Sequence, residues 1–210
     1  MSHAHIYEEQ HEIANQLDRF GVTKQELKEI ALNVVSARNQ ATGLHPTNAP
    51  GTFAYHEGVR SMREVFIKTQ SGWEAECLKG IEVIQHKKSN LVVVFQNVDL
   101  ACGANNPKAI SEKRISSKKL IEGNTLSLFP EISGKTHENR SVWYLCVSSD
   151  SDDVKMELSR PESIDDKGQF SVFSERIFIV TEDDALLPET PIDHDKFEAD
   201  DFDIQVTKKG

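Results

Sequence analysis

The longest apolar stretch of the chain, LVVVFQNVD at residues 91–99, constrains its fold more than any other feature. Short apolar runs that are bounded by turn residues are typical of buried strands. A polar segment, HKKSN at 86–90, precedes this run, and a second strand-like segment, GIEVIQ at 80–85, precedes the polar one. The pattern predicts a β-hairpin at the centre of a sheet.

Three further strands are predicted in the second half of the chain, at 141–147, 154–159 and 169–180, with a bend near 174–176. In the middle strand, apolar residues alternate with Lys155, Glu157 and Ser159, which indicates one face in contact with water. The connections at 148–153 and 160–168 are short and polar, which favours an antiparallel meander.

Three helices are expected before the hairpin, at 4–20, 24–39 and 53–68. Thr23 and Glu26 have the spacing of a capping box at the start of the second helix. The predicted fold is therefore α+β, with three N-terminal helices packed on a mostly antiparallel sheet of about five strands. We expect one domain over residues 1–181, helical over 1–70 and sheet-rich over 73–181, followed by an acidic tail.

The formal net charge of −10 is concentrated near the C-terminus. Residues 182–210 carry ten acidic and three basic residues, so the remainder of the chain has a net charge of only −3. The composition of this tail predicts a segment that is flexible or ordered by a partner. Two phenylalanines among its acids would supply apolar anchors on a basic partner surface, and the expected contact residues are Phe197, Asp200, Asp201, Phe202 and Asp203. The alternative is a tail that only increases solubility.

Cellular location is indicated by what the chain lacks. It has no apolar run of transmembrane length and no N-terminal pattern typical of a signal peptide. Its three cysteines, Cys77, Cys102 and Cys146, are few and far apart, as is typical of reduced thiols. We therefore expect a cytoplasmic protein that does not enter membranes.

Catalytic motifs are incomplete throughout the sequence. The histidines and cysteines lack zinc-ligand spacing, GKT at 134–136 lacks the glycine that a phosphate loop needs, and no GxSxG is present. We expect no metal site and no cofactor. One enzymatic alternative is a metal-dependent phosphodiesterase or nuclease, in which acids hold the metal and a lysine steadies the attacking water. Its residues would be Asp99, Glu74, Glu76 and Lys79; the competing interpretation places both glutamates on the surface and makes Asp99 a turn cap.

The most basic window of the chain follows Asp99. Its cations, Lys108, Lys113, Arg114, Lys118 and Lys119, would neutralise phosphates and give salt-dependent nucleic-acid binding. The window contains no aromatic residue on which bases would stack, and a solvated loop is the competing interpretation.

The sequence favours a non-enzymatic interaction protein. The leading hypothesis is that it binds and modulates a nucleic-acid-handling protein or complex with a basic surface, as an inhibitor or accessory factor of the phage or mobile-element type. One alternative is direct nucleic-acid binding through residues 108–119, gated by the acidic tail. The other is the phosphodiesterase around Asp99.

Overall fold

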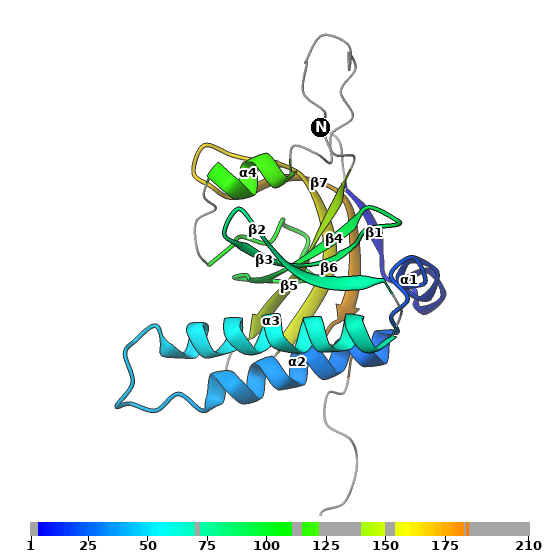
Figure 1. Cartoon of the computed structure of the whole chain (residues 1–210). Coiled ribbons are helices and arrows are strands. Elements are labelled where there is room, and N and C mark those ends of the chain that lie inside the picture. The colour runs from blue at the N-terminus through cyan, green and yellow to red at the C-terminus, as the bar shows by residue number, and fades with distance from the viewer. Residues whose placement is uncertain are drawn as a thin grey trace, which may run out of the picture.

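The computed structural model describes residues 4–69, 72–110, 115–121, 140–149, 154–182 and 184. Within these residues the chain forms one mixed sheet of seven strands, in the order β1-β7-β6-β5-β4-β3-β2, with helices on both faces (Figure 1). The strands are β1 (His5–Tyr7), β2 (Trp73–Leu78), β3 (Ile81–His86), β4 (Leu91–Asn97), β5 (Ser141–Ser149), β6 (Val154–Ile164) and β7 (Phe170–Val180). The helices are α1 (Gln10–Leu17), α2 (Lys24–Asn39), α3 (Ala49–Thr69) and α4 (Ile115–Ile121).

The predicted hairpin is present as β3 and β4, and β4 lies near the middle of the sheet. A second tight hairpin joins β2 to β3 through Lys79 and Gly80, whose φ angles are 53° and 83°. Two consecutive positive φ angles are the signature of a two-residue turn whose twist matches that of the strands. Every residue of β4 from Leu91 to Gln96 is buried, which explains its nearly continuous apolar sequence.

The main core lies between the sheet and the pair α2 and α3, which run side by side across one face (Figure 1). Alternate residues of β4 and β5, such as Val93 and Trp143, point into this core. The capping box predicted at the start of α2 is formed: the Thr23 hydroxyl accepts from the Glu26 N–H at 3.2 Å, and Glu26 Oε2 accepts from the Thr23 N–H at 2.7 Å.

The opposite face of the sheet carries a second, smaller apolar cluster, in which Ile121 of α4 packs near Val142 and Tyr144. The connection that follows β4 also lies on this face and forms a closed loop over residues 98–110. Its ends are paired through a bridge between Val98 and Ala109. This loop is part of the candidate site described below.

The α+β class is correct, but the arrangement differs from the prediction in several ways. The sheet of the described residues has seven strands rather than about five, and β1 pairs with β7, and β4 with β5, in parallel. Residues 5–7 form a strand instead of the first turns of a helix, and α4 follows the first four strands. These features depend on contacts between distant segments, which local periodicity does not encode.

The strand β6 also departs from its prediction. It continues through Pro161 to Ile164, with register shifts against β7 around Pro161 and Ser163. The bend expected near 174–176 corresponds to one of these shifts, between the pairs Arg160–Glu175 and Pro161–Phe173. Proline is tolerated in a strand at such irregularities, because no ladder hydrogen bond is required from it there.

None of the helices in the described part of the chain is both long and apolar enough to cross a membrane.

Candidate functional site: a pocket at the end of β7

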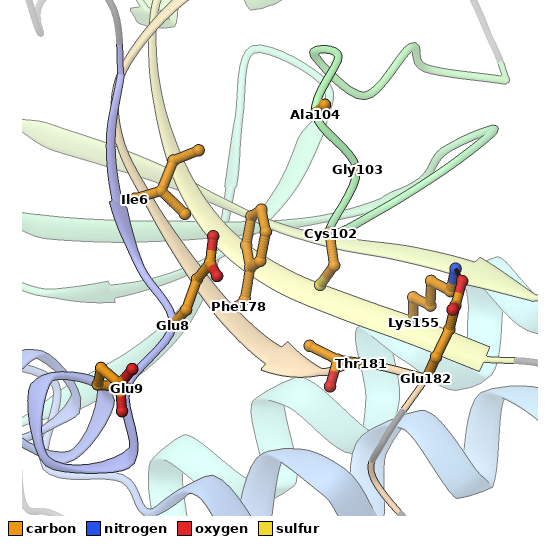
Figure 2. A pocket seen from close by; sticks show the side chains of 10 residues that line it. All are labelled: Ile6, Glu8, Glu9, Cys102, Gly103, Ala104, Lys155, Phe178, Thr181 and Glu182. Atoms are coloured by element: carbon orange, nitrogen blue, oxygen red, sulfur yellow. Dashed lines mark hydrogen bonds and ion pairs between the residues drawn. The ribbon is translucent and has the colours of Figure 1, made fainter.

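A pocket of about 630 Å³ lies where β7 ends, on the sheet face opposite α2 and α3. The neighbours Ile177 and Ile179 point into the main core, so Phe178 between them projects into the pocket from the other face. The remaining lining comes from the β1 region, the 102–104 loop, β6 and the residues after β7: Ile6, Glu8, Glu9, Cys102, Gly103, Ala104, Lys155, Thr181 and Glu182 (Figure 2).

A buried ion pair lies next to this pocket. Arg176 of β7 and Glu157 of β6 are 1% and 0% exposed, and their side chains form two hydrogen bonds, Nε to Oε1 at 2.9 Å and Nη2 to Oε2 at 2.6 Å. The Ser159 hydroxyl donates to Glu157 Oε1 at 2.7 Å. The guanidinium lies 5.0 Å from the centre of the Phe178 ring. A charge pair in such a place is tolerated only because further hydrogen bonds satisfy it.

The same ion pair fixes the loop that forms one wall of the pocket. The Cys102 N–H donates to Glu157 Oε2 at 2.6 Å, and Arg176 Nη1 donates to the Gly103 carbonyl at 3.0 Å. Cys102 has a φ of 55°, an uncommon backbone conformation that these bonds hold in place. The wall is therefore rigid, because it is tied to two buried strands.

The Cys102 thiol faces the pocket but is not activated. Burial, and then the charge of Glu157, raise its pKa far above the ordinary value for cysteine. Its Sγ lies 3.1 Å from the Met156 carbonyl, to which the thiol donates. Because the nucleophile in cysteine chemistry is the thiolate, Cys102 is a structural residue of this wall at neutral pH.

The rim of the pocket is acidic. Its charged residues are Glu8, Glu9 and Glu182 against Lys155. Lys155 hydrogen-bonds to Glu182, which lowers the pKa of the Glu182 carboxyl and holds it ionised. Within the described part of the chain, neither Glu8 nor Glu9 forms an ion pair. Figure 2 shows the Glu8 side chain pointing toward the ring of Phe178. The rim thus has two carboxylates that no described cation neutralises.

The start of the acidic tail is fixed close to this rim. Asp184 Oδ1 forms ion pairs with Lys24 at 3.1 Å and Lys28 at 2.5 Å, both on α2. Its Oδ2 accepts from the N–H of Thr181, a pocket residue, at 3.1 Å. Burial alone would raise the pKa of Asp184, but the hydrogen bonds from Lys28, Thr181 and Lys24 outweigh it and lower that pKa. The tail contact residues predicted from sequence, Phe197, Asp200, Asp201, Phe202 and Asp203, lie outside the described residues.

Asp99, the centre of the phosphodiesterase hypothesis, closes the 98–110 loop. Its Oδ1 accepts from the backbone N–H groups of Leu100 and Lys108, both at 2.7 Å. The backbone adds a bond from the Asp99 N–H to the Lys108 carbonyl at 2.9 Å. This geometry is that of a turn cap.

The other three residues of that hypothesis lie elsewhere. Glu74 and Glu76 of β2 both contact Lys87, at 2.5 and 3.1 Å, and Lys79 is in the β2–β3 turn. The sheet register aligns Glu76 with Val83 and Val83 with Val94, five residues before Asp99. Glu76 and Asp99 are thus about 16 Å apart along the strands and about 10 Å across them. Among the described residues, no group of three or more histidines, cysteines or acids is arranged to hold a metal ion.

The basic window is only partly described. Lys108 is exposed on the closed loop, and Lys118 and Lys119 are exposed on α4. No carboxylate in the described ranges forms an ion pair with any of these three lysines. Lys113 and Arg114 lie outside the described residues.

A second groove, of about 430 Å³, lies between α2 and α3. Its lining residues Arg60 and Glu57 form an ion pair at 2.6 Å, and Arg60 also binds Glu64, outside the groove, at 2.5 Å. Asn33 of the same groove donates to Ser61 at 3.2 Å. Among its described lining residues the groove therefore has no carboxylate without a cationic partner, and the pocket at the end of β7 is the stronger candidate.

Comparisons of the chain with protein families, with characterised proteins and with solved structures found no match.

Sequence reasoning did not find this pocket. Its lining comes from four segments that are far apart in the chain, and Glu157, expected on a wet face of β6, is fully buried together with Ser159. The one available signal was the presence of opposite charges, Glu157 and Arg176, in two adjacent predicted strands. The pairing register that brings them together was not available from the sequence.

Proposed function

We propose that this chain is a non-enzymatic interaction protein that binds a basic surface of a nucleic-acid-handling protein and modulates its activity. The observation that carries the proposal is the attachment of Asp184 to Lys24 and Lys28 of α2. It fixes the root of the acidic tail beside Thr181 and Glu182, and so beside the acidic rim of the pocket. One end of the molecule then presents both acidic features to one partner.

Charge and apolar contacts would contribute to binding in different ways. Acidic residues of the tail would accelerate encounter with a basic surface and set its orientation. Phe197 and Phe202 would supply the apolar contacts that charge alone lacks. A basic surface that binds nucleic acid recognises phosphates largely by charge, so an acidic segment seated there competes with the nucleic acid. This favours an inhibitor or accessory factor acting in the cytoplasm, where three free thiols would remain reduced.

The test compares the full chain with a truncated chain that ends at Asp184, which retains the contacts to α2. Each is used as bait in an extract of the native host at low and high salt, with identification by mass spectrometry. The full chain should recover a nucleic-acid-handling protein at low salt, and the truncated chain should lose it. In a purified reconstitution, the full chain should displace nucleic acid from that protein.

A matched variant separates charge from apolar anchoring. Phe197→Ala combined with Phe202→Ala keeps every tail charge and should weaken capture while leaving its salt dependence. Recovery of no protein at low salt, or equal recovery by the full and truncated chains, would overturn the proposed function.

A second candidate function is direct nucleic-acid binding by the basic window. It is favoured by the exposure of Lys108, Lys118 and Lys119 without ion pairs to described carboxylates. If the tail gates this surface, the chain ending at Asp184 should bind duplex DNA or RNA more tightly than the full chain, with a steep salt dependence. No gain on truncation would remove this candidate.

A further inference from the structure

We propose that the pocket at the end of β7 receives an arginine side chain from the basic partner protein. This inference rests on the proposed function and names the contact by which the body of the chain, rather than its tail, would recognise that partner. The elements that carry it are an aromatic wall, an exposed aliphatic residue and two carboxylates without a described cationic partner, all around one cavity.

The walls of the pocket suit the two parts of an arginine side chain. Phe178 lines the pocket with a ring that is only 7% exposed and that already has the Arg176 guanidinium 5.0 Å from its centre. Against the exposed part of this ring, a planar guanidinium packs more readily than an ammonium ion does. Ile6 on the neighbouring strand β1 is 36% exposed, and the aliphatic stem of arginine would cover it. A cavity of about 630 Å³ holds one long side chain together with the backbone that carries it.

The charges around the pocket favour a cation. Lys155 is neutralised by Glu182, and the buried Arg176 by Glu157, so neither cation repels an incoming guanidinium strongly. Glu8 and Glu9 then remain as carboxylates without a described cationic partner. Glu8 points toward the Phe178 ring, where its two oxygens would accept two N–H groups of a guanidinium bound in the pocket (Figure 2).

The walls of the pocket are held in place by contacts within the chain. The wall at Cys102 and Gly103 is tied to Glu157 and Arg176, and Phe178 belongs to a strand paired on both sides. A preformed site loses little conformational entropy on binding, so even an isolated arginine derivative should bind measurably.

The experiment titrates N-acetyl-arginine amide into the ¹⁵N-labelled full chain and follows amide chemical shifts by NMR. Shifts should concentrate at Ile6, Gly103 and Phe178 and saturate in the millimolar range. The uncharged citrulline derivative should bind at least roughly threefold more weakly, and the lysine derivative should fall between the two. Equal shifts with arginine and citrulline derivatives, or no saturable shift near the pocket, would overturn the inference.

Variants of exposed residues test the carboxylates without threatening the fold. Glu8→Gln combined with Glu9→Gln should weaken binding of the arginine derivative roughly threefold or more. The matched control is Glu74→Gln combined with Glu76→Gln, an acidic pair on the opposite sheet edge, which should leave binding unchanged. An equal loss in both double variants would show that only the net charge matters and would overturn the inference.

The chain ending at Asp184 distinguishes this inference from the proposed function. It retains the whole pocket and should bind the arginine derivative as the full chain does. If the arginine derivative binds but no partner is captured, the pocket inference stands and the proposed function is wrong. If the tail captures a partner but the arginine derivative does not bind, the proposed function stands and the pocket inference is wrong.

Discussion

At the scale of single residues, Gly58 marks a close approach between the helical layer and the sheet. A Cβ atom at this position of α3 would lie 2.1 Å from Cζ of Phe95 on β4. Phe95 is itself 1% exposed, so its ring has no free space to enter. Glycine here is required by packing and not by backbone conformation.

We therefore expect Gly58→Ala to lower the free energy of unfolding by about 1–2 kcal/mol, because overpacking outweighs the gain in helix propensity. Gly51→Ala in the same helix is the matched control, since nothing lies within 4 Å of a Cβ there, and it should be neutral or slightly stabilising. Urea denaturation of both variants measures the difference. Equal stability of the two would contradict the packing of α3 on β4.

At the scale of elements, the pair formed by Arg176 and Glu157 joins β6, β7 and the loop that follows β4. Removing one member leaves the other buried and charged, which is costly, whereas neutralising both is much less so. Arg176→Met should therefore destabilise the fold by about 3–5 kcal/mol, and adding Glu157→Gln should restore part of this loss.

The readouts are chemical denaturation and hydrogen exchange at the Cys102 amide, which donates to Glu157. Exchange there should accelerate in Arg176→Met more than in the double variant. Arg60→Met, which breaks an exposed ion-pair network on α3, is the control and should cost no more than about 1 kcal/mol. If the destabilisation in the double variant equalled the sum of the destabilisations in Arg176→Met and Glu157→Gln, the two side chains would not be energetically coupled, and the ion pair would not join these elements.

The elements also show how far sequence reasoning reached. The strands β3, β4 and β5 were predicted because their apolar runs are long and bounded by polar turns. The edge strands β1 and β2 were missed: β1 has three residues, and β2 carries its two acids on a sheet edge. Ile6 fits a helical spacing with Ile13 and Leu17, which extended the predicted first helix over β1.

The candidate site was harder to predict than the fold. Its residues gather through the parallel pairing of β1 with β7 and through a loop bound to Arg176, and both are contacts between distant parts of the chain. By contrast, the turn-cap interpretation of Asp99 was accessible locally, because an aspartate directly after a strand often accepts backbone N–H groups.

At the scale of the whole molecule, one attachment gives the root of the acidic tail a defined place. Asp184 provides that place by joining the end of the sheet to α2 through Thr181, Lys24 and Lys28. The attachment is ionic, so it should respond to pH and to salt, unlike the apolar packing of α2 on the sheet.

The sign of the pH response follows from the lowered pKa of Asp184 in the folded state. A carboxyl with a folded pKa below its unfolded value of about 3.9 contributes its full stability above that value. This contribution is lost as the pH falls through the folded pKa. Asp184→Asn should therefore reduce the free energy of unfolding by roughly 1 kcal/mol near neutral pH. The difference in the free energy of unfolding between Asp184→Asn and the unmodified chain should shrink progressively below about pH 4.

Denaturation curves of both chains from neutral pH to about pH 3 measure this difference in the free energy of unfolding. The control is Glu29→Gln, at an exposed position on α2, the helix that carries Lys24 and Lys28. The control should change stability little across the range. High salt should reduce the Asp184 effect at neutral pH, because it screens the ion pairs with Lys24 and Lys28. A constant difference at every pH would mean that Asp184 acts through its size and backbone contacts, and the tail would then have no electrostatic attachment to α2.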